Sequence, residues 1–127
     1  MMVQVSDSEL DLLKIIWANG GTALYAHIMG ELSKAGCTWQ KNTVITLLSR
    51  LAEKGMVKTH KIGRKNQYTA VVSEREYQKA QAQQLLNKLY DGSAKGLVST
   101  LIQGEMISAE EYEELKQFWE TGEADGS

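Results

Sequence analysis

The segment 38–54 carries polar side chains at a spacing that could read the edges of DNA bases. On a helix, Asn42, Thr46 and Ser49 would share one face, because residues three or four apart are neighbours. An asparagine can bind both hydrogen-bonding groups of an adenine, and hydroxyl groups can bind bases or phosphates. Ile45 lies among them, where it would either contact a thymine methyl group or extend the apolar side of the helix. The pattern favours a surface that meets double-stranded DNA.

Basic side chains flank this face and continue after it. Lys41 and Arg50 are placed to bind phosphates, and Thr38 stands where a helix start could offer backbone N–H groups to a phosphate. Arg64 and Lys65 fall in a turn further along and suit the DNA backbone or the minor groove. Any one of these lysines alone is best explained as a solvated surface residue. Together, directly after the polar face, the basic residues favour DNA.

The charge is divided between the two ends of the chain. The formal net charge is only −2 over 127 residues. Residues 34–65 nevertheless hold eight basic side chains against one acidic one, a net charge of +7. Residues 105–127 hold eight acids against one lysine, a net charge of −7. The distribution suits a protein with one end attracted to phosphate and the other repelled by it.

Three helices are predicted before residue 55, at 7–18, 23–34 and 40–54. Ser6 and Glu9 form a capping box before the first helix. Thr22 is expected to cap the second. The third has apolar residues at the i, i+3, i+4, i+7 spacing of a buried helix face, namely Val44, Leu47, Leu48 and Leu51. Short helices joined by glycine-containing turns predict a helix-turn-helix core.

The next segment alternates in the manner of a two-stranded hairpin. Residues 57–62 and 67–70 are the predicted strands, and residues 63–66 are the predicted charged turn. A two-stranded hairpin is marginal alone, so it is expected to pack on the helices. The side chains expected to do so are Met56, Val57, Tyr68 and Val71. Residues 1–72 therefore predict a winged helix-turn-helix domain, with three helices and a two-stranded β-wing.

The second half of the chain is predicted to be helical, which makes the fold mainly α. Helices are expected at about 74–90, 94–103 and up to residue 120, so that residues 73–120 form a three-helix region. Their apolar stripes are too large to stay exposed on a monomer, which predicts a homodimer. The side chains expected at the dimer interface are Leu85, Leu86, Leu89, Leu97, Val98, Leu101, Ile102, Leu115, Phe118 and Trp119. Residues 121–127 are predicted to be a disordered acidic tail.

The sequence offers little support for other classes of site. One cysteine, Cys37, excludes an internal disulfide and a cysteine-rich metal site. The two histidines, His27 and His60, have no metal-ligand partner at a recognisable spacing, and no nucleophile motif or glycine-rich phosphate loop is found. We expect no enzymatic activity, no cofactor and no metal. No stretch is apolar enough to span a membrane, so we expect a cytoplasmic protein.

A series of positions has the order and spacing of a known family. They are the segment 5–17, the pattern from Trp39 through Thr43 and Arg50 to Gly55, Tyr68 in the hairpin, and the segments 89–92 and 107–111. Over residues 5–119 the chain resembles the penicillinase repressors (the BlaI/MecI/CopY family). The resemblance implies a homodimeric winged-helix repressor that binds an inverted-repeat operator, with Thr43 among the DNA-binding residues of its recognition helix.

The same resemblance suggests how such a repressor could be switched. In antibiotic-resistance members a membrane sensor protease triggers cleavage in the dimerisation region, and the cleaved Asn-Phe bond aligns here with Thr100 and Leu101. A sensor protease is thus a possible partner. Copper-responsive members carry paired C-terminal cysteines, which this chain lacks. Ile45 stands where a basic or amide residue is common in the family, so a different operator sequence is expected.

Two other functions are alternatives to that of a transcriptional repressor. A winged-helix protein-interaction module would have no need of the positive charge around residues 34–65. An RNA-binding protein would use exposed aromatic residues to stack bases. Trp39 and Tyr68 are the only candidates for stacking, and both are better explained as packing residues. The sequence therefore favours a DNA-binding repressor.

Overall fold

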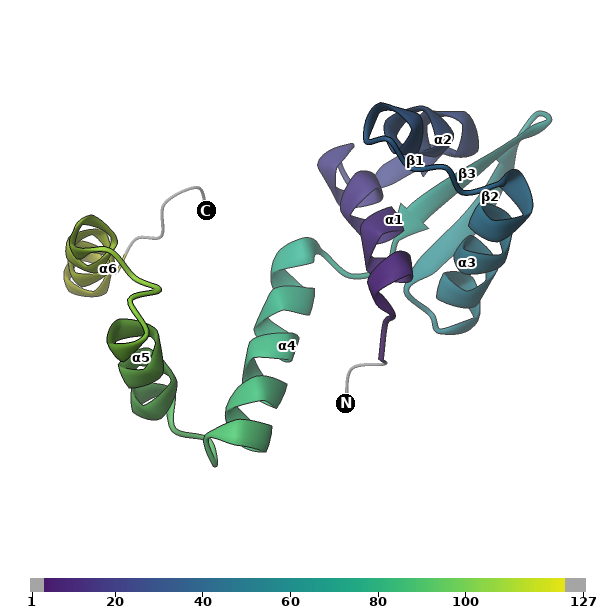
Figure 1. Ribbon diagram of the computed structural model, residues 1–127. Helices are drawn as coiled ribbons and strands as arrows, with labels where there is room; N and C mark the ends of the chain where they lie inside the picture. The colour runs from purple at the N-terminus through teal and green to yellow at the C-terminus, as the bar shows by residue number, and fades with distance from the viewer. Residues whose placement is uncertain (1–3, 123–127) are drawn as a thin grey trace. The chain divides into compact units, whose positions relative to one another are not determined.

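The computed structural model describes residues 4–122 and forms two compact units, which divide between Gln81 and Ala82 (Figure 1). The elements, in chain order, are α1 (Asp7–Ala18), β1 (Thr22–Leu24), α2 (Tyr25–Lys34), α3 (Lys41–Glu53), β2 (Val57–Ile62), β3 (Lys65–Ala70), α4 (Glu74–Leu89), α5 (Ala94–Gln103) and α6 (Ala109–Thr121). The division falls inside α4, whose first turns belong to the first unit. Each of the predicted helices is present. No helix among residues 4–122 combines the length and apolar character needed to cross a membrane.

Helix α1 begins at the predicted capping box. The Ser6 hydroxyl accepts a hydrogen bond from the Glu9 backbone N–H at 3.2 Å, and the Glu9 carboxylate accepts one from the Ser6 N–H at 2.9 Å. These bonds satisfy two N–H groups that a helix start leaves unpaired. At the other end, Gly20 and Gly21 have φ values of 77° and 93°, which lets the chain turn sharply towards β1.

The prediction for Thr22 was wrong, because residues 22–24 form strand β1 and not the start of a helix. Helix α2 begins at Tyr25 without a side-chain cap. The Thr22 hydroxyl lies 3.0 Å from the Thr69 hydroxyl and 3.3 Å from the Tyr68 carbonyl oxygen. Pairing with β3 holds these three residues in an extended conformation, so a tertiary contact outweighs the local capping preference.

The sheet is antiparallel and three-stranded, in the order β1-β3-β2. The wing itself is the predicted β2–β3 hairpin, but its turn is shorter than the predicted segment 63–66. Ile62 pairs directly with Lys65, which leaves Gly63 and Arg64 as the turn. Gly63 has a φ of 64°, as two-residue hairpin turns require. Strand β1 adds a second neighbour to β3, so the wing is supported by more than its own ladder.

The core of the first unit gathers the apolar faces of α1, α2 and α3 against the base of the sheet. Its buried side chains include Leu12, Leu13, Ile16, Ile28, Val44, Leu47, Leu48, Leu51, Met56, Val57 and Tyr68. The packing prediction for Val71 was wrong, since this side chain is 48% exposed. Its neighbour Val72 packs against the core instead. Tyr68, Ala70 and Val72 all pack on the core, and because successive side chains on extended backbone point to opposite faces, Val71 faces away.

The start of α4 is attached to α1 by aromatic packing. The Trp17 indole N–H donates to the Val72 carbonyl oxygen at 2.9 Å. The Trp17 and Tyr77 rings lie 5.8 Å apart between centroids, and Tyr77 is buried. Aromatic pairs at this separation add to the free energy gained by burial. The first unit therefore needs the chain as far as the first turn of α4.

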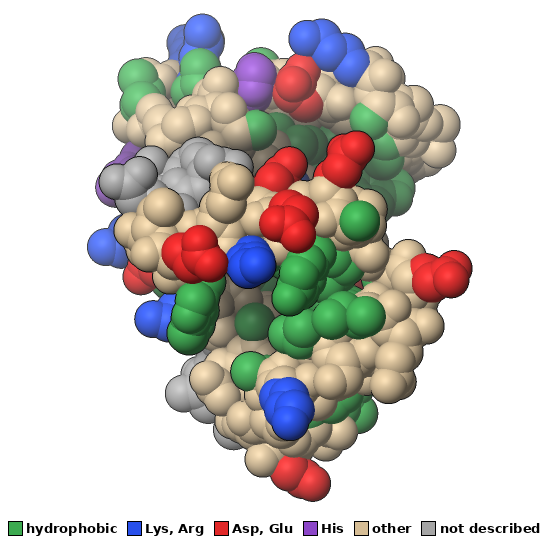
Figure 2. Space-filling model, turned by 90° about the vertical axis from the view of Figure 1, so that its left-hand side faces the viewer, with side chains coloured by type: hydrophobic (Ala, Val, Ile, Leu, Met, Phe, Trp, Pro, Cys, Tyr) green, Lys and Arg blue, Asp and Glu red, His purple; other side chains and the backbone are tan. Residues whose placement is uncertain are grey.

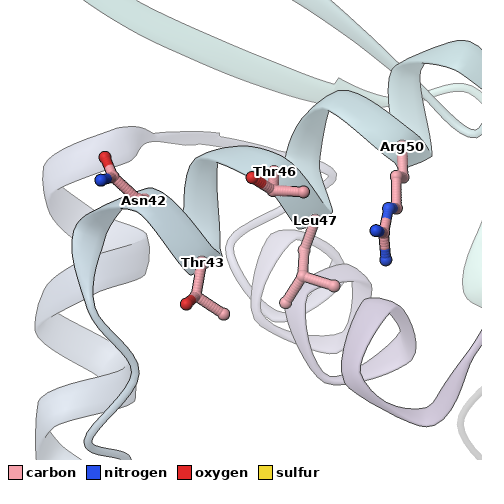
Figure 3. A pocket seen from close by; sticks show the side chains of 5 residues that line it. All are labelled: Asn42, Thr43, Thr46, Leu47 and Arg50. Carbon is pink, nitrogen blue, oxygen red and sulfur yellow. The ribbon is translucent and has the colours of Figure 1, made fainter.

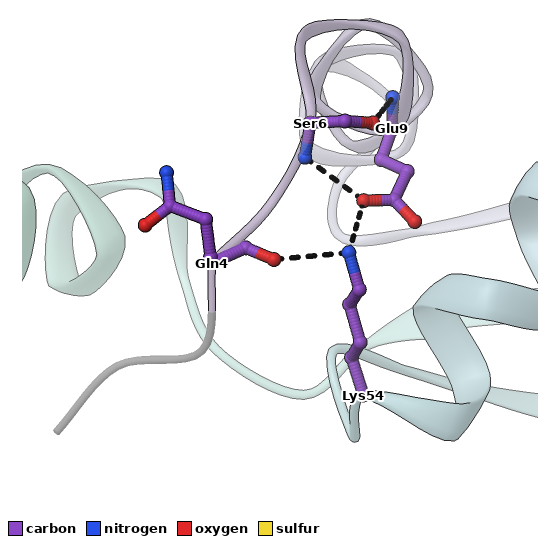
Figure 4. Close-up of polar contacts among 4 residues, drawn as sticks. All are labelled: Gln4, Ser6, Glu9 and Lys54. Carbon is purple, nitrogen blue, oxygen red and sulfur yellow. Dashed lines mark hydrogen bonds and ion pairs between the residues drawn. The ribbon is translucent and has the colours of Figure 1, made fainter.

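One buried ion pair joins the start of α1 to the end of α3 (Figure 4). Glu9 is 1% exposed, and Lys54 donates to its carboxylate at 2.5 Å and to the Gln4 carbonyl oxygen at 2.9 Å. Burial alone would raise the pKa of Glu9. The Lys54 ammonium and the Ser6 N–H and hydroxyl outweigh burial and hold the pKa below the ordinary value of 4.5. Its second oxygen, Oε2, has no hydrogen-bond partner among the described residues, so the site depends on Lys54.

The second unit lacks a comparable interior. Within its described part, neither α5 nor α6 has a buried residue. The exposed large apolar side chains are Leu85, Leu89, Val98, Ile102, Met106, Tyr112, Leu115, Phe118 and Trp119. Hydrophobic groups bordered by acidic side chains are visible on the face in Figure 2. Of the predicted tail, Thr121 belongs to α6 and residues 123–127 lie outside the described residues.

Replacement of Lys54 by methionine is expected to destabilise the protein. The change leaves the buried Glu9 carboxylate without its ion-pair partner, and removing one partner of a buried pair costs about 3–5 kcal/mol. Because the Lys54 side chain is 31% exposed, we expect a loss at the lower end of this range. The free energy of unfolding, measured by urea denaturation at pH 7, should fall by about 3 kcal/mol. The control is Lys34→Met. Its ion pair with Glu31 involves an 81% exposed lysine side chain, so its loss should change the free energy of unfolding little.

The wild type and Lys54→Met should also differ in the way that their free energy of unfolding changes with pH. A lowered pKa means that Glu9 stabilises the wild-type fold above pH 4.5, and that this stabilisation is lost as pH falls through the folded value. In Lys54→Met only the Ser6 groups oppose the effect of burial, so the pKa of Glu9 should be higher than in the wild type. The difference in free energy of unfolding between the wild type and Lys54→Met should therefore become smaller below pH 4.5. A difference that stayed constant from pH 7 to pH 3 would exclude the buried ion pair as its cause.

Candidate nucleic-acid interface

The polar face of α3 is at the surface, opposite the side that the core buries. Asn42, Thr46 and Ser49 are exposed, while Val44, Leu47, Leu48 and Leu51 are buried. Ile45 is 46% exposed. Of the two interpretations of Ile45, the structure excludes an extension of the buried face and leaves the side chain available for an apolar contact outside the protein.

An open depression runs along one side of α3 (Figure 3). Its lining residues are Asn42, Thr43, Thr46, Leu47 and Arg50. In Figure 3, Thr43, Leu47 and Arg50 project to one side of the helix, as their spacing of about one turn requires. Asn42 projects from the first turn, away from these three. The depression thus combines two hydroxyl groups, an amide and a guanidinium group, a set that can bind bases and phosphates.

The start of α3 has free backbone donors. The helix begins at Lys41, and no side-chain hydrogen bond caps it at Gln40. The N–H groups of a first turn have no partner within the helix, and together with the helix dipole they form a binding site for anions. Thr38 is exposed but lies three residues before the helix, so it is an approach residue and does not provide an N–H of the first turn.

Not every basic residue of segment 34–65 belongs to this surface. Lys41 and Arg50 are exposed, and neither forms a salt bridge with another residue in the range 4–122. Lys54 is held by Glu9 and Gln4, so its charge is used inside the fold. Lys34 pairs with Glu31 at 3.0 Å. The positive charge that remains for a ligand is concentrated on α3 and the wing.

The wing places two of the predicted residues at its tip. Arg64 lies in the two-residue turn and Lys65 begins β3, and both are exposed. Strand β2 has only its first residue, Val57, buried. Sequence reasoning did not assign a role to Ile62, which is 52% exposed beside the turn. Its signal in the sequence was an apolar residue in an otherwise charged hairpin tip.

The predicted residues of the second unit are at or near its surface. Leu86, Leu97 and Leu101 are partly buried, and the exposed members of the set are Leu85, Leu89, Val98, Ile102, Leu115, Phe118 and Trp119. Thr100 and Leu101 lie within α5, where the Thr100 hydroxyl donates to the Gly96 carbonyl oxygen at 3.1 Å. The peptide bond between them is therefore part of a regular helix.

Comparison with known proteins gives consistent matches over almost the whole chain. The family model described as Penicillinase repressor matches residues 5–121. A penicillinase repressor of Bacillus licheniformis is 35% identical over 117 residues, which covers 92% of this chain and 90% of the relative. The methicillin resistance regulatory protein MecI of Mammaliicoccus sciuri is 29% identical over 113 residues, covering 89% and 90%.

Two solved structures resemble the first unit. One is the DNA-binding domain of the repressor BlaI, with 38% identity and a TM-score of 0.52. The other is the monomeric form of Bacillus licheniformis BlaI in complex with the blaP half-operator, with 38% identity and a TM-score of 0.51. Each match covers 61% of this chain and 92% of the solved chain. The matches confirm the predicted winged helix-turn-helix fold. This chain belongs to the penicillinase repressor family.

Proposed function

We propose that this protein is a sequence-specific DNA-binding repressor of transcription. The single observation that carries the proposal is the exposed polar face of α3 beside free cations at Arg50 and at the wing tip. Helix-turn-helix proteins place such a helix in the major groove, with its N-terminal residues at the base edges. The monomeric form of BlaI that this unit resembles was solved in complex with the blaP half-operator, which supports the same role here.

The roles of the side chains follow from their chemistry. Asn42 is the candidate for a bidentate contact with adenine, and Ile45 for contact with a thymine methyl group. Thr43, Thr46 and Ser49 provide hydroxyl groups, and Lys41 and Arg50 provide charges for phosphates. The proposed set of DNA-binding residues is completed by Thr38, which precedes α3, and by Arg64 and Lys65 at the wing tip. A protein-interaction module, the alternative function, would leave these unpaired cations without a purpose.

The proposal includes a homodimer that binds an inverted repeat, one half-site for each copy. Support comes from the second unit, where neither α5 nor α6 has a buried residue in the described chain and large apolar side chains are exposed. Exposed apolar surface of this kind marks an association site. Two-fold symmetry of the protein would then match two-fold symmetry of the operator. Action on DNA in a bacterium would place the protein in the cytoplasm.

The proposal also includes a way to release the repressor from DNA, which is cleavage between Thr100 and Leu101. The family relationship supports this part of the proposal. The bond lies inside α5, and helical backbone resists proteolysis, which concentrates in exposed loops. A sensor protease, directly or through another enzyme, would therefore act on a locally unfolded form of α5. No cofactor or metal is assigned a role in this scheme.

DNA affinity is expected to fall steeply with salt, and the wing tip should account for part of that slope. Arg64→Ala with Lys65→Ala removes two phosphate-binding charges, so the slope of log K against log salt should decrease by about 2. Binding to unrelated sequences should weaken by a similar factor. Fluorescence anisotropy at several salt concentrations measures both quantities.

The control for the wing variant removes two charges outside the proposed interface. Lys79 and Lys88 are exposed on α4, and Lys79→Ala with Lys88→Ala should leave the slope nearly unchanged. If both double variants reduced the slope equally, the effect would reflect total charge. The proposed contact at the wing would then be wrong.

Substitutions on α3 should change which sequences are bound. Asn42→Ala and Ile45→Ala each remove a proposed base contact, so each should cost about 1–3 kcal/mol at one operator position and little elsewhere. Selection from a random DNA pool with wild type and each variant would locate the affected base pairs. A uniform loss of affinity, with the preferred sequence unchanged, would reassign these residues to the DNA backbone.

Truncation after Gln81 should separate DNA binding from dimerisation. This end point keeps Tyr77 and its packing on Trp17, so the first unit should remain folded. We expect a monomer in analytical ultracentrifugation that binds an isolated half-site as the full chain does but binds the complete operator at least tenfold more weakly. A truncated chain that still dimerised would contradict the assignment of the interface to the second unit.

A further inference from the structure

Three large apolar side chains are exposed in the described part of the first unit, namely Ile45, Ile62 and Val71. Ile45 belongs to the proposed base-reading face. Val71 follows β3, at the base of the wing and away from its tip. Ile62 is the last residue of β2, directly before the turn, and is 52% exposed. A solvent-facing isoleucine at the tip of a basic hairpin therefore has no role in the scheme so far.

The strand register fixes the direction of Ile62. Thr59 pairs with the buried Tyr68, and Val57 is buried, so odd-numbered residues of β2 face the core side of the sheet. Side chains alternate along a strand. Ile62 therefore lies on the opposite face, next to its cross-strand partner Lys65. The two-residue turn at Gly63 and Arg64 holds this end of the hairpin in one register.

The surroundings of Ile62 limit what can cover it. Arg64 lies in the turn that follows it, and Lys65 is opposite on the same face. A wholly apolar partner surface would have to desolvate these cations, which costs free energy unless they are paired. Pairing of β2 with another strand is also disfavoured, because lysines along an edge strand oppose such contacts. A suitable partner must offer anions and apolar surface at the same place.

The minor groove of DNA meets both requirements. Its rims are phosphates, its walls are deoxyribose rings, and its narrow form attracts arginine and lysine. Proteins that bind there often make apolar contacts as well, and isoleucine is among the side chains that they insert between base steps. We propose that Ile62 packs against deoxyribose in the minor groove next to the major groove occupied by α3, while Arg64 and Lys65 bind the flanking phosphates. This inference rests on the proposed function and adds an apolar contact to it.

The first test compares Ile62→Thr with Val71→Thr in the full-length protein. Both changes keep a β-branched residue, so the strand propensity is preserved. The two native side chains have similar exposure, 52% and 48%. An apolar contact releases no counterions. We therefore expect Ile62→Thr to weaken operator binding about three- to tenfold at every salt concentration, without a change in the salt slope, and Val71→Thr to have no effect.

The second test is hydroxyl-radical footprinting on the selected operator, which reports the accessibility of deoxyribose in the minor groove. Wild type should protect a patch of sugars beside the α3 site, and Ile62→Thr should lose this patch at saturating protein while it keeps the rest of the footprint. Equal affinity and an equal footprint for Ile62→Thr and wild type would overturn the inference, as would a change in salt slope. A wild-type protein that binds no DNA would instead overturn the proposed function.

Discussion

The burial of one side of α3 is the constraint on which the interface depends. Val44, Leu48 and Leu51 are fully buried, and this burial fixes the rotation of the helix about its axis. Once those positions face the core, Asn42, Ile45 and Thr46 must face outwards, because a helix turns by a set angle at each residue. The presentation of the polar face is thus a consequence of apolar packing on its opposite side.

The ion pair between Lys54 and Glu9 fixes the position of the end of α3. Lys54 directly follows the helix, and its bonds to Glu9 and to the Gln4 carbonyl oxygen attach this end to the beginning of α1. A buried ion pair contributes little net stability compared with a well-packed apolar pair, but it strongly disfavours arrangements in which its partners separate. We infer that its main role is to fix the position of α3. The ion pair also neutralises the charge of Lys54. The net charge of residues 34–65 is therefore larger than the positive charge available to bind DNA.

Much of this organisation could be predicted from the sequence, and the errors have a common cause. The helices follow from capping boxes and helical periodicity, which are local signals. Strand β1 is three residues long and is defined by pairing with β3, some 45 residues later in the sequence, so no local pattern marks it. The turn was overestimated because Lys65 and Asn66 are both polar, and only the cross-strand register assigns them to β3. The partner of Lys54 could not be recognised for the same reason.

The two units differ in a way that links stability to assembly. The first unit has a continuous core that includes most of the apolar residues of α1, α2 and α3. In the second, α5 and α6 have capped ends and regular helical bounds but no buried residue within the described chain. Isolated helices of this length are marginal in water, so local capping alone cannot account for their stability. In the homodimer proposed above, apolar contacts between the copies would add the free energy that keeps these helices folded, and a change that separates the copies would then also weaken α5. Such a coupling would make the Thr100–Leu101 bond more accessible in the dissociated protein than in the dimer, because cleavage requires α5 to unwind.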